Sequence, residues 1–181
     1  MSKIQKIVKF LLLLFCFNIF SSIAQTNEDI PLNNLAINEI PKPISALKFE
    51  DFSGNKINLK NYHGKLVIIN FWATWCAPCK KEMPSLDRLS QNKEFKNLII
   101  FPINMEPPNT IKTKNFFSAL KIKKLEIFFD ENLNFVKIFK LRGVPTTILI
   151  IKNGEEFARI TGSIDFQDKK FINWLLFYDK I

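Results

Sequence analysis

The strongest constraint on the fold is an apolar run that leads directly into a pair of cysteines. Residues 65–71 read KLVIINF, a nearly uninterrupted apolar segment that follows Gly64. Such a run predicts a parallel strand that is buried on both faces. A helix is predicted over residues 77–91, with Pro78 in its first turn, where proline is tolerated, and with a kink at Pro84. The cysteines are therefore expected where a buried strand passes into a helix.

The remaining segments alternate between strand and helix patterns. Further strands are expected over 98–103 and 127–129 and in two hairpins, 47–52 with 56–59 and 146–152 with 155–161; further helices are expected over 109–120, 133–139 and 165–178. This order predicts an α/β fold, a mixed central sheet flanked by helices. The core candidates on the helices are Ile111, Phe116, Phe117 and Leu120, and then Phe171, Trp174, Leu175 and Tyr178.

The N-terminal segment has the pattern of an export signal. Three lysines precede the apolar run 10–20, and Ser22-Ile23-Ala24 supply the small residues that a signal peptidase needs. The alternative is an uncleaved membrane anchor. The chain is thus divided into a signal peptide or membrane anchor over 1–24, a spacer over 25–45 and one domain over 46–181. Either form of the leader places this domain in the periplasm or on the outer face of the cytoplasmic membrane.

Composition excludes two broad classes of protein. With 47% hydrophobic and 24% charged residues among 181, most of the chain is too apolar to be disordered. The formal net charge of +9 is spread along the sequence. The densest basic group lacks the interleaved aromatic residues that stack on bases. A solvated basic surface is therefore expected, and nucleic acid is not an expected partner.

The two cysteines outside the leader, Cys76 and Cys79, indicate redox chemistry. Their spacing places both sulfurs on one face of the first helical turn, close enough to form a bridge. The helix N-terminus favours a thiolate at Cys76, and the thiolate is the attacking species. A zinc site needs further ligands, but only His63 is present, and it is expected in an exposed loop. No metal or cofactor is expected. The peroxidase pattern Pro-x-x-x-Thr-x-x-Cys is absent, because Ala73 stands three residues before Cys76.

Residues 71–86, FWATWCAPCKKEMPSL, resemble the active site of the thioredoxin superfamily, and most of all its TlpA/ResA branch of exported thiol–disulfide oxidoreductases. The resemblance covers residues 46–181. It implies a thioredoxin-like fold with an N-terminal β-hairpin and a central helix–strand insertion. It also implies a cis Val144–Pro145 bond that faces the cysteines and leaves a backbone edge open to a substrate peptide. Trp75, Val144 and Pro145 are the substrate-binding residues that it implies.

The same resemblance implies the reaction. Cys76 attacks a substrate disulfide, and Cys79 resolves the mixed disulfide. The implied substrates are protein disulfides in cytochrome biogenesis, either in apocytochromes or in the copper-site proteins of cytochrome oxidase assembly, and a membrane electron-transfer protein restores the dithiol. Two alternatives stay open: a general periplasmic oxidant or isomerase, and a non-enzymatic module that binds clients.

The resolving thiol needs a base, for which the sequence offers one candidate glutamate. Thioredoxins carry a buried acid six residues before the first cysteine, where this chain has Asn70. ResA-like members imply a glutamate in the loop after the next strand, and Glu106 is the nearest match, offset by one position. The alternative for Glu106 is an exposed loop acid. Glu82 is expected to be a surface residue or a charge at the start of the helix.

Overall fold

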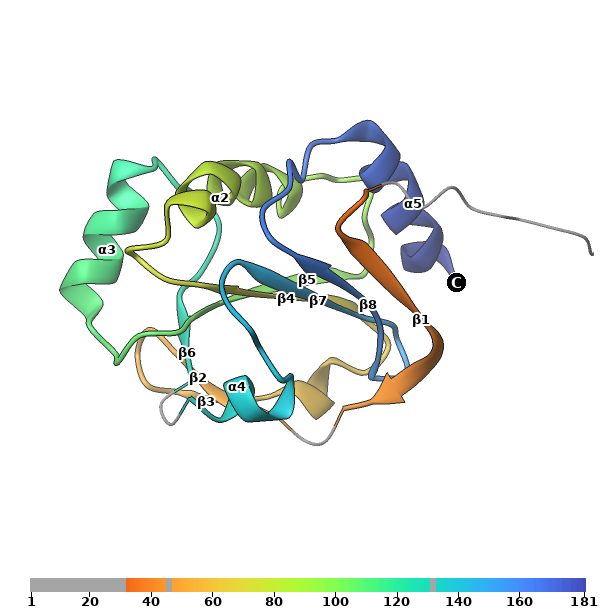
Figure 1. Cartoon of the computed structure of the whole chain (residues 1–181), viewed down its shortest axis with the longest axis horizontal. Coiled ribbons are helices and arrows are strands. Elements are labelled where there is room, and N and C mark those ends of the chain that lie inside the picture. Colours follow the sequence, from red (N-terminus) through yellow and green to blue (C-terminus); the bar gives the residue numbers. More distant parts are fainter. Residues whose placement is uncertain (1–31, 45–46, 131–132) are drawn as a thin grey trace, which may run out of the picture.

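The described part of the chain, residues 32–44, 47–130 and 133–181 of the computed structural model, folds around one mixed sheet (Figure 1). Its strands are β1 (Leu35–Pro43), β2 (Lys48–Asp51), β3 (Lys56–Asn58), β4 (Leu66–Trp72), β5 (Leu98–Asn104), β6 (Phe128–Phe129), β7 (Thr146–Ile150) and β8 (Glu155–Thr161). Its helices are α2 (Ala77–Leu89), α3 (Thr110–Ala119), α4 (Asn134–Ile138) and α5 (Lys169–Lys180), with a short 3-10 helix at Leu59–Tyr62. The strand order is β1-β8-β7-β4-β5-β6-β2-β3.

Strand β4 lies in the middle of this sheet, and all seven of its residues are buried. It runs parallel to β5 and antiparallel to β7. Helices α2, α3 and α5 cover one face, whereas α4 covers the other (Figure 1). The side chains of β4 alternate between two cores: Trp72 packs with α2, α3 and α5, and Phe71 packs with α4. The predicted mixed sheet with helices on both faces is confirmed.

The predicted hairpins and the central insertion are also present. Strands β2 and β3 pair antiparallel, as do β7 and β8, and the insertion contributes α3 and then β6, which pairs with β5. Helix α5 begins at Lys169, four residues later than expected. The Asp168 side chain accepts a hydrogen bond from the backbone N–H of Phe171 at 3.0 Å, which fixes the helix start.

Strand β1 corrects the prediction that residues 25–45 are a spacer. From Leu35 to Pro43 the chain pairs antiparallel with β8, so this stretch belongs to the sheet. β1 is an edge strand, and most of its side chains are exposed. An edge strand needs no regular alternation of apolar residues, and it tolerates prolines such as Pro41. Residues 35–43 therefore lack the apolar alternation that predicts a strand, and their prolines resemble those of a loop.

For one residue of α3, Ile111, the prediction of a core position is wrong. Ile111 is 73% exposed, whereas Phe116 and Phe117 are buried and Leu120 packs against the same core. Ile111 precedes Phe116 by five positions, which places it about 140° away around the helix. In α5 the predicted apolar stripe is confirmed, because its members pack into the core beside α2.

The predicted signal peptide or anchor, residues 1–24, lies outside the described residues. Within the described residues, no helix is both long enough and apolar enough to cross a membrane.

Candidate active site

Cys76 and Cys79 lie at the point where β4 passes into α2. Cys76 is the N-cap of α2, and its Sγ accepts a hydrogen bond from the backbone N–H of Cys79 at 3.2 Å. The two sulfurs are joined in a disulfide, so the predicted proximity is confirmed. Cys79 is fully buried, whereas Cys76 retains 3% exposure. In the reduced form, the Cys76 sulfur at the helix N-terminus is therefore the one stabilised as a thiolate.

The segment before β7 lies at the same end of the strands as the cysteines. β7 runs antiparallel to β4, and Thr146 pairs with Phe71, so the start of β7 is next to the end of β4. The Val144–Pro145 peptide bond is cis, as expected. Val144 contacts both cores, and the Pro145 carbonyl accepts a hydrogen bond from the N–H of Gly162 at 2.9 Å.

Trp75, directly before Cys76, is the large exposed side chain of this region. Its side chain is 69% exposed although both neighbours, Thr74 and Cys76, are buried. An exposed indole next to a reactive sulfur provides apolar area and a hydrogen-bond donor for a partner chain. His63, in contrast, is exposed in a loop, as predicted.

Glu82 corrects the expectation of a surface acid. It lies in α2, one turn after Cys79, and is only 2% exposed. Its carboxyl oxygens accept hydrogen bonds from Asn70 Nδ2 at 2.9 Å and from the N–H of Ile164 at 3.2 Å. Burial raises the pKa of Glu82 from about 4.5 to about 7, although both hydrogen bonds lower it.

Asn70 connects this carboxyl group to the neighbouring strand. Its Nδ2 also donates to Thr147 Oγ1 at 3.0 Å, while its own Oδ1 has no partner among the described residues. Asn70 thus occupies the position six residues before Cys76 and holds Glu82 in place. Thioredoxins have an acid at the position of Asn70, and in this chain Glu82 of α2 places a carboxyl group next to that position.

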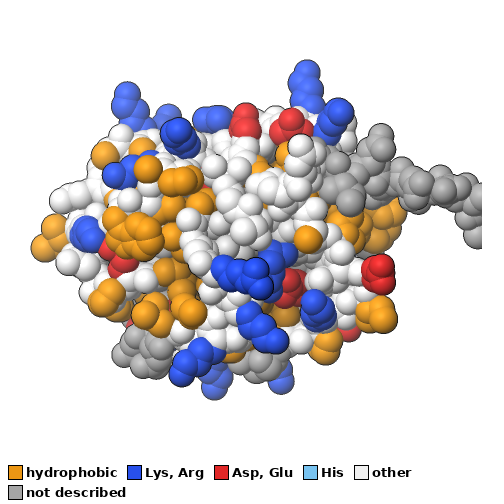
Figure 2. Space-filling model, in the orientation of Figure 1, with side chains coloured by type: hydrophobic (Ala, Val, Ile, Leu, Met, Phe, Trp, Pro, Cys, Tyr) orange, Lys and Arg blue, Asp and Glu red, His pale blue; other side chains and the backbone are white. Residues whose placement is uncertain are grey.

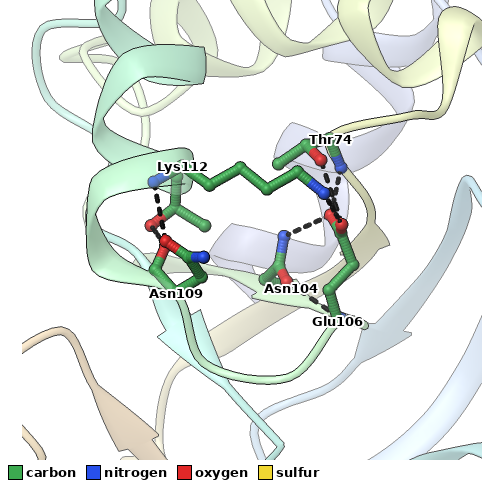
Figure 3. Close-up of polar contacts among 6 residues, drawn as sticks. Thr74, Asn104, Glu106, Asn109 and Lys112 are labelled. Carbon is green, nitrogen blue, oxygen red and sulfur yellow. Dashed lines mark hydrogen bonds and ion pairs between the residues drawn. The ribbon is translucent and has the colours of Figure 1, made fainter.

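Glu106 has a different environment (Figure 3). It follows β5, and its carboxylate accepts hydrogen bonds from the backbone N–H of Thr74 at 2.5 Å and from Thr74 Oγ1 at 3.0 Å. It also forms an ion pair with Lys112 of α3 and contacts Asn104. Partial burial raises the pKa of Glu106, but the hydrogen bonds from Lys112, Thr74 and Asn104 outweigh it and lower the pKa below its ordinary value. Glu106 thus fastens the loop before Cys76.

The comparisons with known proteins agree with this geometry. The family model of the AhpC/TSA family matches residues 40–155. The thiol-disulfide oxidoreductase ResA of Bacillus thuringiensis is 34% identical over 124 residues, which cover 68% of this chain and 70% of that protein. ResA of Halalkalibacterium halodurans is 33% identical over 118 residues, covering 65% and 66%. This chain belongs to the ResA-like thiol-disulfide oxidoreductases of the AhpC/TSA family.

Two solved structures share the fold of this oxidoreductase. A thiol:disulfide interchange protein of the thioredoxin family from Chlorobium tepidum has a TM-score of 0.64 at 20% identity, covering 77% of this chain and 99% of its own. StoA from Bacillus subtilis has a TM-score of 0.58 at 24% identity, covering 74% and 97%. The predicted thioredoxin-like fold is confirmed.

The oxidoreductase site thus combines a reactive pair with a buried acid that sequence reasoning missed. The signal was available in the helical spacing. Cys79, Met83 and Leu86 mark the inward face of α2, and position 82 borders that face, about 40° around the helix from Leu86. The described residues contain no group of three or more His, Cys, Asp or Glu side chains that could hold a metal ion.

Proposed function

We propose that this thiol-disulfide oxidoreductase reduces disulfides of client proteins outside the cytoplasm. The observation that carries the proposal is the placement of Cys76 at the N-terminus of α2, with a buried carboxyl group one turn beyond Cys79. The helix end lowers the pKa of the attacking thiol. The buried acid supplies a group that can take the proton of the resolving thiol. The leader pattern of residues 1–24 supports the location.

In the proposed reaction the electrons pass from the dithiol to the client. The Cys76 thiolate attacks one sulfur of the client disulfide, that S–S bond breaks, and the other client sulfur leaves as a thiolate. Cys79 then loses its proton and attacks the Cys76 sulfur. The mixed disulfide breaks and the second client sulfur leaves. The client gains two electrons and two protons in total, and the protein ends with the Cys76–Cys79 disulfide.

We assign the proton of Cys79 to Glu82 in place of Glu106. A carboxyl group with a pKa of about 7 is half ionised near neutral pH, which suits a proton acceptor. The carboxylate of Glu106 has a lowered pKa and is already occupied by Thr74 and Lys112. Its contacts favour a structural role for Glu106 in the loop before Cys76.

The client class and the reductant are the finer parts of the proposal. The likeness to ResA and to the TlpA/ResA branch supports clients in cytochrome biogenesis, either apocytochrome cysteines or the cysteines of copper-site assembly proteins. Trp75, Val144 and Pro145 are proposed to hold the client peptide beside Cys76. A membrane electron-transfer protein is proposed to return two electrons to the disulfide after each turnover.

Trapping of mixed disulfides tests this function. Cys79→Ser leaves the attack intact but removes resolution, so clients should accumulate on Cys76, where mass spectrometry identifies them. Cys76→Ser is the matched control and should trap far less, because Cys79 is fully buried. Capture by Cys79 alone would reverse the assigned roles. No turnover by the wild type, with client binding retained when both cysteines are replaced, would favour a non-enzymatic module.

The direction of electron flow is tested on the same protein. Titration of the pair against glutathione or dithiothreitol should give a potential nearer the roughly −270 mV of thioredoxin than the roughly −120 mV of the oxidant DsbA. A value near that of DsbA would support an oxidant.

A further inference from the structure

A basic pocket lies beside the segment that leads into β7. It has a volume of about 330 Å³ and is open to solvent. Its lining residues are Lys140, Leu141, Arg142, Thr146, Arg159 and Thr161. Three of these six carry a positive charge, and two carry a hydroxyl group that can contact an anion.

The three cations of this pocket are not equivalent. Arg159 donates to both carboxylate oxygens of Glu156, at 2.9 and 3.1 Å, and to the Phe139 carbonyl at 2.6 Å. Its charge is therefore balanced and its guanidinium is held in the wall. Lys140 and Arg142 are exposed, and their side chains form no ion pair within the described residues. These two unpaired cations give the pocket its excess positive charge.

The pocket is lined by residues at the same end of the strands as the redox pair. Thr146 of the pocket pairs with Thr161 on one side and with Phe71 on the other. Phe71 is five residues before Cys76, and Arg142 is three residues before Pro145. Figure 2 shows Lys and Arg side chains gathered near the middle of one face of the molecule, with hydrophobic side chains to one side of them.

We propose that this pocket binds an acidic side chain of the client, in the segment that flanks the disulfide being reduced. The inference rests on the proposed function, since it names the client that the redox pair prefers. Carboxylates suit this site because Arg142 can bind them through two parallel N–H groups, with Lys140 as a second cation. The charge excess of the pocket would steer acidic clients towards Cys76 and disfavour basic ones.

Single-turnover reduction of matched peptides tests the proposal. Three peptides share one intramolecular disulfide and differ only in flanking residues, which are two Glu, two Gln or two Lys. The fully reduced protein should react with the Glu peptide about fivefold faster than with the Gln peptide at low salt, a ratio typical of a few exposed charge pairs. At about 1 M salt the preference should disappear, because the screening length falls to about 3 Å.

Charge reversal at the pocket should invert this order. The double variant Lys140→Glu/Arg142→Glu should react faster with the Lys peptide than with the Glu peptide. The matched control, Lys169→Glu/Lys170→Glu, makes the same change in net charge at exposed positions in the first turn of α5, where acids are tolerated. This control should keep the preference for the Glu peptide.

An uncharged disulfide, dithiodipyridine, distinguishes a failure of the pocket proposal from a failure of the proposed redox function. All variants should react with it at equal rates, because it does not depend on the pocket. Equal rates for the three peptides, with intact reaction towards dithiodipyridine, would overturn the pocket proposal and leave the redox function standing. A wild-type protein that reduces neither the peptides nor dithiodipyridine would overturn the proposed function itself.

Discussion

At the scale of single residues, two glutamates near the cysteine pair have opposite electrostatic environments. Glu82 is buried, and burial raises its pKa to about 7. Glu106 is partly buried as well, yet its hydrogen bonds from Lys112 and Thr74 lower its pKa. The difference comes first from the deeper burial of Glu82 and then from the partners, because Glu82 has neutral donors and Glu106 has a cation. The two side chains can therefore be distinguished by the pH dependence of the reaction.

We expect the release of client from the mixed disulfide to depend on Glu82. In the wild type, this rate should rise as pH passes through about 7, where the Glu82 carboxylate forms. Glu82→Gln removes the proton acceptor and should slow release by about 100-fold at pH 7, the lower end of typical general-base effects. Stopped-flow measurement of the second reaction phase between pH 5 and 9 gives the profile.

Glu106→Gln is the matched control for this experiment. It removes the charge that pairs with Lys112 but leaves an oxygen for one of the two hydrogen bonds from Thr74. Its profile should keep the rise near pH 7. An unchanged profile in Glu82→Gln, together with a lost rise in Glu106→Gln, would return the base to Glu106.

The cysteine pair could be predicted from its motif and the cis Val144–Pro145 bond from the family resemblance, whereas the partners of the glutamates could not be predicted. All residues of a short motif are close together in the sequence, so a Cys pair at the start of a helix can be recognised without the structure. The helical spacing of α2 indicates an inward position for Glu82, but its hydrogen-bond partners, Asn70 and the N–H of Ile164, are 12 and 82 residues away in the sequence. No pattern within α2 reports such distant partners.

At the scale of elements, Asp87 fastens the central insertion to helix α2. Its carboxylate accepts hydrogen bonds from three consecutive backbone N–H groups, those of Lys123, Lys124 and Leu125, at 3.1, 2.8 and 2.9 Å. The side chain is 5% exposed, so water cannot easily replace it. This contact fixes the segment between α3 and β6.

Asp87→Asn should therefore destabilise the fold. The amide group would place a donor against backbone donors, and the cost should be about 2 kcal/mol in the free energy of unfolding, as for lost hydrogen bonds to a charged group. Urea unfolding measures this change. Glu94→Gln, at an exposed position, is the control and should change stability by less than about 0.5 kcal/mol. Equal stability of both variants would contradict the role of Asp87.

Strands with a clear apolar pattern, such as β4, were predictable from the sequence. Strand β1, which is held by its pairing with β8, was not. The run 65–71 is apolar throughout because β4 is buried on both faces. β1 has no such pattern, since it is held mainly by its pairing with β8 and only Leu35 is buried among its side chains. A strand at the edge of a sheet carries few buried side chains, so the sequence holds little trace of it.

At the scale of the whole molecule, three carboxyl groups among the described residues, those of Asp51, Glu82 and Glu106, have shifted pKa values that couple stability to pH. Hydrogen bonds from Asn55 lower the pKa of Asp51, and the contacts of Glu106 lower its pKa. Both groups stabilise the fold above their ordinary pKa values and lose that effect as pH falls. Glu82 acts in the opposite direction. Its pKa is raised, so its contribution is most favourable below pH 4.5 and weakens as pH rises towards 7.

We therefore expect the oxidised protein to lose stability between pH 5 and pH 8, by up to about 3 kcal/mol in the free energy of unfolding. Glu82→Gln should show no such loss. The comparison uses the difference between the two pH values, because glutamine cannot accept both hydrogen bonds and changes the absolute stability as well. Urea unfolding at both pH values measures it, and an equal loss in wild type and variant would contradict the burial of an ionisable Glu82. At neutral pH the buried carboxyl group lowers the stability of the fold, and the proposed proton transfer from Cys79 gives a reason for its position one turn beyond Cys79 in α2.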